Sequence, residues 1–228
     1  MKHLSILLGS MDLRRTAAVL FGSIVVVGLI GALTLWLDPE NAWFDLDSEI
    51  GLAWPPGDAT LALPALWSAA LLALAGTAWV TVGWMGTEAR LRRTAAVLGA
   101  VLLFFAVDEL FIVHERLEAR SGIDWQTLYL PLAVAVAMLL AVIAYELRHR
   151  DRRIAWMLLG GGACWAIAVL LEQLQWRGDE QVGLYGLLMI PEELLELGGS
   201  SLLIMAALAA LHVLPAAGEA DIHARDPS

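Results

Sequence analysis

Six long apolar stretches constrain this 228-residue chain more than any other feature of its sequence. Each is close to the roughly 20 residues that a helix needs to cross a hydrocarbon layer of about 30 Å. The chain is 59% hydrophobic and 17% charged, whereas soluble domains have roughly 45–50% and about 25%. We therefore predict an all-α, polytopic membrane bundle of six transmembrane helices. The expected spans are 16–37, 60–83, 94–114, 127–146, 154–175 and 188–212.

The basic residues predict how this bundle is oriented. Lys and Arg near the ends of spans favour the cytoplasmic side, and acidic residues contribute little. Most of the 14 Lys and Arg residues lie before the first span, in segments 84–93 and 147–153, or in the C-terminal tail. This pattern predicts that both termini face the cytoplasm, in a bacterial cytoplasmic (inner) membrane. The first apolar run is as long as a span and no A-x-A-like site ends it, so we expect it to be retained.

The spans leave no room for a separate soluble domain. We predict a cytoplasmic N-terminus at 1–15, a single transmembrane domain at 16–212 and a disordered cytoplasmic tail at 213–228. An outer acidic loop at 38–59 is expected at headgroup level, with a short interfacial helix over 40–50. The net charge of −10 says little about nucleic acid, but the sequence lacks a basic patch for phosphates, so no nucleic-acid partner is expected. Membrane lipid is the expected partner.

Acidic residues inside the predicted spans are the main functional signal. A charged Asp at a span centre costs roughly 2.5–3.5 kcal/mol. At about 1.5 Å per residue from the cytoplasmic ends, the acids of three spans fall in one layer beneath the outer face. Within this layer His114 and Arg116 are the available cations, so we expect a bound metal ion, shared protons or water to neutralise the acids. The candidate site residues are Asp108, Glu109, His114, Glu115, Glu172, Glu192, Glu193 and Glu196.

Helical spacing predicts that these side chains converge. On a continuous helix Asp108 and Glu115, seven residues apart, are nearly eclipsed. His114 lies about 120° from Asp108 around that helix, so it is either a ligand or a group that points to the headgroups. We predict Asp108, Glu109, Glu172 and Glu196 as the core of the pocket, with the other four as ligands or supporting residues.

Small residues next to the acids indicate helix faces suited to close contact. In span 154–175, Gly161, Trp165, Ala168 and Glu172 form one stripe. In span 188–212, the acidic face continues into Gly199–Ser200, whose small side chains permit close approach of a neighbouring helix. Each of these spans therefore presents its carboxylate on a face suited to meeting a neighbour.

Oxygen ligands together with an imidazole favour a divalent metal. Iron, manganese or zinc suits such a set, and calcium or magnesium suits it if His114 is not a ligand. A ferritin-like di-iron site is poorly supported because its Glu-x-x-His motifs are absent. A metal here would support hydrolysis or redox chemistry on a small-molecule or lipid substrate.

Two alternatives belong to other classes. In a proton- or cation-coupled transporter, Asp108, Glu172 and Glu196 would relay protons or bind a cation. In a structural subunit or scaffold, the acids would be protonated and would hydrogen-bond between helices. The sequence alone leaves these alternatives, and the oligomeric state, open.

The remaining polar and aromatic residues are predicted to be structural. Cys164 is the single cysteine, so no disulfide within the chain can form, and we expect it to pack as a small apolar residue. Tryptophan is enriched where a membrane meets water. We therefore predict an interfacial belt that includes Trp67, Trp79, Trp84, Trp125, Trp156 and Trp176.

Three motifs resemble those of a known group of proteins. They are D-E-x4-H-E at 108–115, Leu171-Glu172, and E-E-L-L-E-L-G at 192–198. In this combination the chain resembles, over roughly 94–212, a group of six-span bacterial membrane proteins that often read L-S-L-D-E-x4-H-E. Here Phe105-Ala106-Val107 stand in place of Leu-Ser-Leu. The resemblance implies which residues matter; it implies no reaction, because the group has no assigned activity.

Overall fold

The structure is a computed structural model that describes residues 12–37, 63–111, 113–177, 180–181 and 185–214. The outer loop predicted at 38–59, with its interfacial helix, lies outside the described residues. So does nearly all of the tail predicted to be disordered. These expectations remain predictions.

Six long helices form the described part of the chain, and all six are long and apolar enough to cross a membrane. The predicted all-α, six-span bundle is therefore confirmed. A shorter helix and a pair of two-residue antiparallel strands complete the fold. The helices are α2 (Leu13–Leu37), α3 (Leu63–Met85), α4 (Ala89–Phe111), α5 (Val113–Ser121), α6 (Trp125–Leu147), α7 (Arg152–Gln175) and α8 (Tyr185–Val213), and the strands are β1 (Trp176–Arg177) and β2 (Glu180–Gln181).

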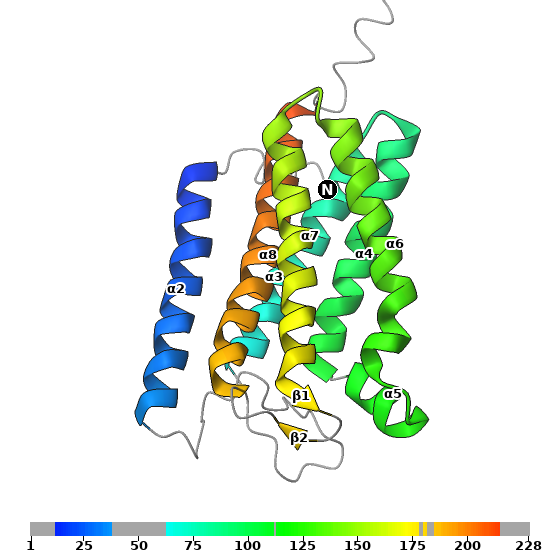
Figure 1. The fold of residues 1–228 in the computed structure, drawn as a ribbon. Coiled ribbons are helices and arrows are strands. Elements are labelled where there is room, and N and C mark those ends of the chain that lie inside the picture. The colour runs from blue at the N-terminus through cyan, green and yellow to red at the C-terminus, as the bar shows by residue number, and fades with distance from the viewer. Residues whose placement is uncertain (1–11, 38–62, 112, 178–179, 182–184, 215–228) are drawn as a thin grey trace, which may run out of the picture.

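The two ends of the bundle differ in character. The starts of α2, α4 and α7 and the ends of α6 and α8 lie at one end, whereas α5 and the two strands lie at the other (Figure 1). We call the first the basic end and the second the site end. The basic end carries Arg14, Arg15, Arg90, Arg92, Arg93, Arg148, Arg150, Arg152 and Arg153.

Two ion pairs at the basic end join consecutive helical hairpins. Arg90 Nε lies 3.3 Å from Glu146 Oε1, which ties the start of α4 to the end of α6. Arg150 Nη2 lies 2.8 Å from Glu88 Oε1, which ties the α6–α7 connection to the α3–α4 connection. These pairs neutralise two of the arginines gathered there.

The core of the bundle is built on α3 and α8. Within an 18-residue stretch of each span 61% and 72% of the residues are buried, compared with 17% in the corresponding stretches of both α2 and α6. α8 packs against α7, α3 and α2. The Trp79 ring on α3 is fully buried, and its Nε1 donates a hydrogen bond to the Leu203 carbonyl oxygen of α8 at 3.1 Å. The interfacial belt prediction is therefore wrong for Trp79, because α3 lies inside the bundle; Trp84 and Trp156 are exposed.

Glycines allow neighbouring helices to approach closely. A methyl group on Gly199 of α8 would lie 2.9 Å from the Gly161 carbonyl oxygen of α7 and would strike the Trp165 ring. The small-residue face of the last span therefore does meet a helix closely, and that helix is α7. Gly76 of α3 and Gly99 of α4 approach each other in the same way. Cys164, on α7, is half-buried.

The third span ends earlier than the sequence predicts. Instead of one helix over 94–114, α4 ends at Phe111 and α5 begins at Val113. The nearly eclipsed arrangement predicted for Asp108 and Glu115 is therefore wrong, because the two residues belong to different helices. The angle of about 120° between His114 and Asp108, which assumes a continuous helix, does not apply either.

The α3–α4 contact predicts the effect of one methyl group. An alanine Cβ at Gly99 would lie 2.6 Å from the Val80 backbone nitrogen and 2.7 Å from the Gly76 carbonyl oxygen. Because these are backbone atoms, the helices must move apart, and such overpacking costs about 1–3 kcal/mol. Gly99→Ala should lower the midpoint of thermal unfolding in detergent. Gly22→Ala is the control, since its Cβ meets nothing within 4 Å, and equal midpoints for the two variants would contradict this packing.

Candidate functional site

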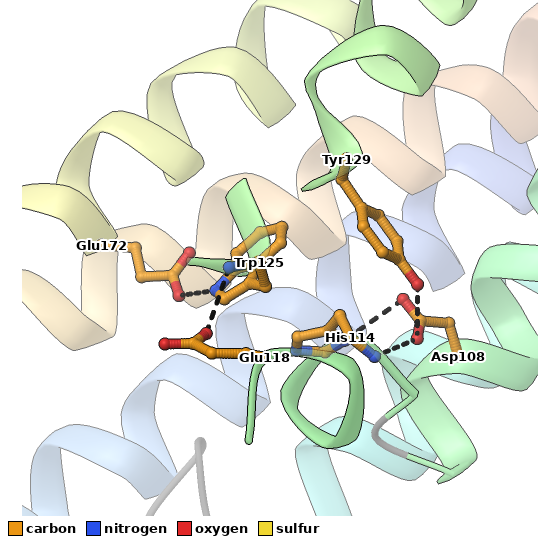
Figure 2. Close-up of polar contacts among 6 residues, drawn as sticks. All are labelled: Asp108, His114, Glu118, Trp125, Tyr129 and Glu172. Carbon is orange, nitrogen blue, oxygen red and sulfur yellow. Dashed lines mark hydrogen bonds and ion pairs between the residues drawn. The ribbon is translucent and has the colours of Figure 1, made fainter. Parts of the chain in front are cut away.

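The candidate site is built around the buried carboxylate of Asp108, in the last turn of α4. Its Oδ1 accepts a hydrogen bond from the His114 backbone nitrogen at 2.9 Å, and its Oδ2 lies 3.2 Å from His114 Nδ1 (Figure 2). Because α5 begins at Val113, the first contact caps the start of that helix, where backbone N–H groups lack helical partners. Asp108 thus fixes both α5 and the imidazole that α5 carries.

A hydroxyl on α6 completes the surroundings of Asp108. Tyr129 Oη donates to Asp108 Oδ1 at 3.2 Å. An ionised carboxylate only accepts hydrogen bonds, so His114 Nδ1 carries the proton when Asp108 is ionised. The second ring nitrogen, Nε2, is then the basic atom of the imidazole. The contacts therefore select one tautomer of His114.

Two aromatic rings of α6 hold the His114 ring in place. Its centroid lies 4.9 Å from that of Trp125 and 6.2 Å from that of Tyr129. The two aromatic rings, four residues apart on one face of α6, meet edge to face at 5.9 Å. Such packing restricts the imidazole to one orientation beside Asp108.

Trp125 connects this pair to two further carboxylates. Its Nε1 donates to Glu172 Oε1 of α7 at 3.1 Å, and its backbone nitrogen donates to Glu118 Oε2 of α5 at 3.2 Å (Figure 2). A single tryptophan therefore joins α5, α6 and α7 at the site end. This contact shows that Trp125 has a polar role in addition to the interfacial one predicted from the sequence.

Amides at the end of α7 extend the polar network to α8. Gln175, which is 2% exposed, donates from Nε2 to Glu192 Oε2 of α8. Gln173 donates from Nε2 to Gln126 Oε1 of α6. Glu172 and Gln175, three residues apart on α7, lie on the same side of the helix. Glu192 is thus held by the helix face that also presents Glu172.

The structure brings some of the predicted residues into direct contact and places the others at the same end of the bundle. Asp108 and His114 are in contact, so the alternative in which His114 points to the headgroups is not what the structure shows. Glu172 contacts Trp125, and Glu192 contacts Gln175, as described above. Glu109 of α4 and Glu193 and Glu196 of α8 are half-buried, and the side chain of Glu115 lies outside the described residues.

The predicted metal site is not assembled in the described part of the chain. There, no group of three or more His, Cys, Asp or Glu side chains is arranged to hold a metal ion. The geometry instead gives a carboxylate–imidazole pair with aromatic and amide neighbours. This arrangement can orient an imidazole for proton transfer.

Several residues of the site were absent from the sequence-based set: Glu118, Trp125, Gln126, Tyr129, Gln173 and Gln175. Two signals were available. Trp125 and Tyr129 have the i, i+4 spacing of one helix face, directly after the loop that follows the D-E-x4-H-E motif. Gln173 and Gln175 are polar residues next to Glu172 at the end of an apolar span.

The fold and the site define a multi-pass helical membrane protein with a carboxylate–imidazole site at one end. Residues 12–211 match the domain of unknown function DUF8692. The chain therefore belongs to this family, which agrees with its resemblance to a group without assigned activity. No curated protein and no solved structure matches the chain.

The Tyr129 contact predicts a measurable loss of stability. Tyr129→Phe removes the hydroxyl that donates to the buried carboxylate and leaves the ring in place. A hydrogen bond to a charged group contributes about 1.5–3 kcal/mol, so thermal unfolding in detergent should begin at a lower temperature. Tyr145→Phe is the matched control on the same helix, because Tyr145 is exposed and its hydroxyl donates to no described residue. Similar losses in both variants would show that the Tyr129–Asp108 bond contributes nothing.

Proposed function

We propose that this protein carries out acid–base chemistry at the site end, with His114 as the group that takes up and returns a proton. Asp108 orients the imidazole and stabilises its protonated form. The observation that carries this proposal is the double contact of Asp108 with His114, through the backbone nitrogen at 2.9 Å and through Nδ1 at 3.2 Å. A carboxylate that binds Nδ1 makes Nε2 the basic nitrogen of the ring, and a basic imidazole nitrogen is what general-base catalysis requires.

Exposure favours the imidazole over the carboxylate as the reacting group. The His114 side chain is 20% exposed and that of Asp108 is 8% exposed. A substrate that approaches the site end therefore reaches the imidazole first. Histidine also changes charge near neutral pH more readily than other side chains, which suits it to proton transfer.

The position of the site supports a substrate at the outer face of a bacterial inner membrane. The arginines gather at the opposite end of the bundle, and basic residues favour the cytoplasmic side. In this orientation His114 lies near the outer leaflet, within reach of water and lipid headgroups. A small molecule or lipid with a hydroxyl group, or a water molecule that attacks it, would supply the proton.

Chemical modification tests whether Asp108 activates His114. Diethyl pyrocarbonate acylates an unprotonated imidazole nitrogen, and mass spectrometry reports the rate at each of the five histidines. In Asp108→Asn the rate at His114 should fall about fivefold, the equivalent of about 1 kcal/mol. Asparagine keeps an oxygen that can accept from the His114 backbone nitrogen, and circular dichroism would confirm unchanged helix content.

His212 is an internal control for this experiment. Its Nδ1 lies 2.7 Å from the Leu208 carbonyl oxygen, so its ring is held by a neutral acceptor in place of a carboxylate. Its rate should be the same in both proteins. If Asp108→Asn leaves the His114 rate unchanged, Asp108 does not activate the imidazole and the proposal fails.

Metal binding is the second candidate, favoured by the polar links between α7 and α8. Glu172 of α7 contacts Trp125, whose ring packs on His114, and Glu192 of α8 contacts Gln175, three residues from Glu172 on α7. Iron, manganese or zinc would use His114 and these carboxylates, which would have to move together around the ion. Bound water on such an ion would be activated for hydrolysis.

Elemental analysis of the purified protein separates the candidates. A metalloprotein should hold stoichiometric metal and lose it in both Glu172→Gln and Glu192→Gln. Arg93→Gln, at the basic end, is the control that should keep the metal. Absence of metal together with pH-driven uptake of a cation into liposomes would instead favour transport. Absence of both is expected for metal-free acid–base chemistry and for a scaffold, and the modification rate at His114 distinguishes these two.

A further inference from the structure

A second feature lies at the basic end, far from the site described above. There the connection that follows α6 and the first turns of α7 border an open hollow of about 500 Å³. Its lining joins basic and apolar side chains: Arg148, His149, Arg152, Ala155, Trp156 and Leu159. The hollow therefore has a charged part next to an apolar part.

The charged part carries two arginines that no described carboxylate neutralises. Arg90 and Arg150 pair with Glu146 and Glu88. Within the described part of the chain, by contrast, neither Arg148 nor Arg152 forms an ion pair. Asp151, which precedes Arg152, caps α7 instead: its Oδ1 accepts a hydrogen bond from the Arg153 backbone nitrogen at 2.8 Å. The hollow thus keeps an excess of positive charge.

Arg148 is held in position by its neighbours. Its guanidinium carbon lies 3.8 Å from the centroid of the Tyr145 ring. Its Nε donates to His149 Nε2 at 3.1 Å. The two terminal nitrogens make no hydrogen bond with any described residue. The two terminal nitrogens of a guanidinium held in this orientation can donate a pair of hydrogen bonds to two oxygens of one phosphate.

The apolar part follows α7 into the span. Arg152, Trp156 and Leu159 share one face of the helix, at spacings of four and seven residues. Trp156 is 73% exposed and Leu159 is 46% exposed, so the surface here offers an indole and an aliphatic side chain. Seven residues of helix extend about 10 Å, which is long enough to lie along the first part of an acyl chain.

We propose that this hollow binds an anionic phospholipid. The phosphate would lie between Arg148 and Arg152, and an acyl chain would follow Trp156 and Leu159 toward the centre of the bilayer. Basic pockets between membrane helices on the cytoplasmic side suit anionic headgroups, and tryptophan suits the headgroup level. The apolar stripe distinguishes a lipid from free phosphate, which would use the arginines alone.

Native mass spectrometry of the full chain in detergent tests this proposal. The probes are dioleoyl phosphatidylglycerol and, as the neutral comparison, dioleoyl phosphatidylcholine. Wild-type protein should retain the anionic phosphatidylglycerol in preference to the neutral phosphatidylcholine. The Arg148→Gln, Arg152→Gln double variant should bind it about 30-fold more weakly, from about 1 kcal/mol for each arginine near the membrane surface.

The matched control is the Arg92→Gln, Arg93→Gln double variant. It removes the same charge at the same end of the bundle, from exposed residues of α4 that do not line the hollow. Its affinity for phosphatidylglycerol should stay within roughly twofold of the wild type. An equal loss in both double variants would mean that net charge alone attracts the lipid, and would overturn the proposal.

A third variant tests the apolar part. Trp156→Ala should weaken retention of phosphatidylglycerol while leaving the unfolding temperature unchanged, because the Trp156 side chain is exposed. Inorganic phosphate should not displace the lipid at equal concentration. Displacement by phosphate, or equal binding of phosphatidylcholine, would overturn the assignment to an anionic lipid.

Discussion

The buried carboxylate of Asp108 is the constraint on which the site end depends. A carboxylate within an apolar span is costly unless donors surround it. The chain meets this need by ending α4 at Phe111 and placing the first turn of α5 against Asp108. Asp108 thus has three donors: the backbone nitrogen of His114, the ring of His114 and the Tyr129 hydroxyl of α6. Three segments are therefore arranged around one carboxylate.

The same donors that stabilise this carboxylate also position the imidazole. The hydrogen bonds that allow Asp108 to be buried restrict His114 to one orientation and one tautomer. Trp125, which packs on His114, donates a hydrogen bond to Glu172 of α7. Gln175 of α7 donates one to Glu192 of α8. Stability and the proposed chemistry thus rest on shared contacts, whereas the opposite end of the bundle uses surface ion pairs and a lipid-facing hollow.

Features set by composition and helical period could be predicted from the sequence. The six spans follow from apolar run length, and the small residues at 199–200 indicate a face for close helix approach, although the sequence does not indicate that α7 is the helix that meets it. The contact of His114 with Asp108 could not be predicted, because angular reasoning assumes a continuous helix and α4 ends between them. Tyr129 and Trp125 were missed because amphipathic aromatic residues near a span end have the same sequence signature whether they face lipid or a carboxylate.

The position of α2 has a consequence for how the protein is assembled during synthesis. α2 is the first of the six spans to emerge from the ribosome, yet its buried stripe of Leu20, Ile24 and Val27 packs mainly against α8, the last. Its partner is therefore missing while roughly 150 residues are made. During that interval α2 must persist alone in the lipid, as its mean hydropathy of 2.4 permits. Docking of this helix then marks the completion of the bundle.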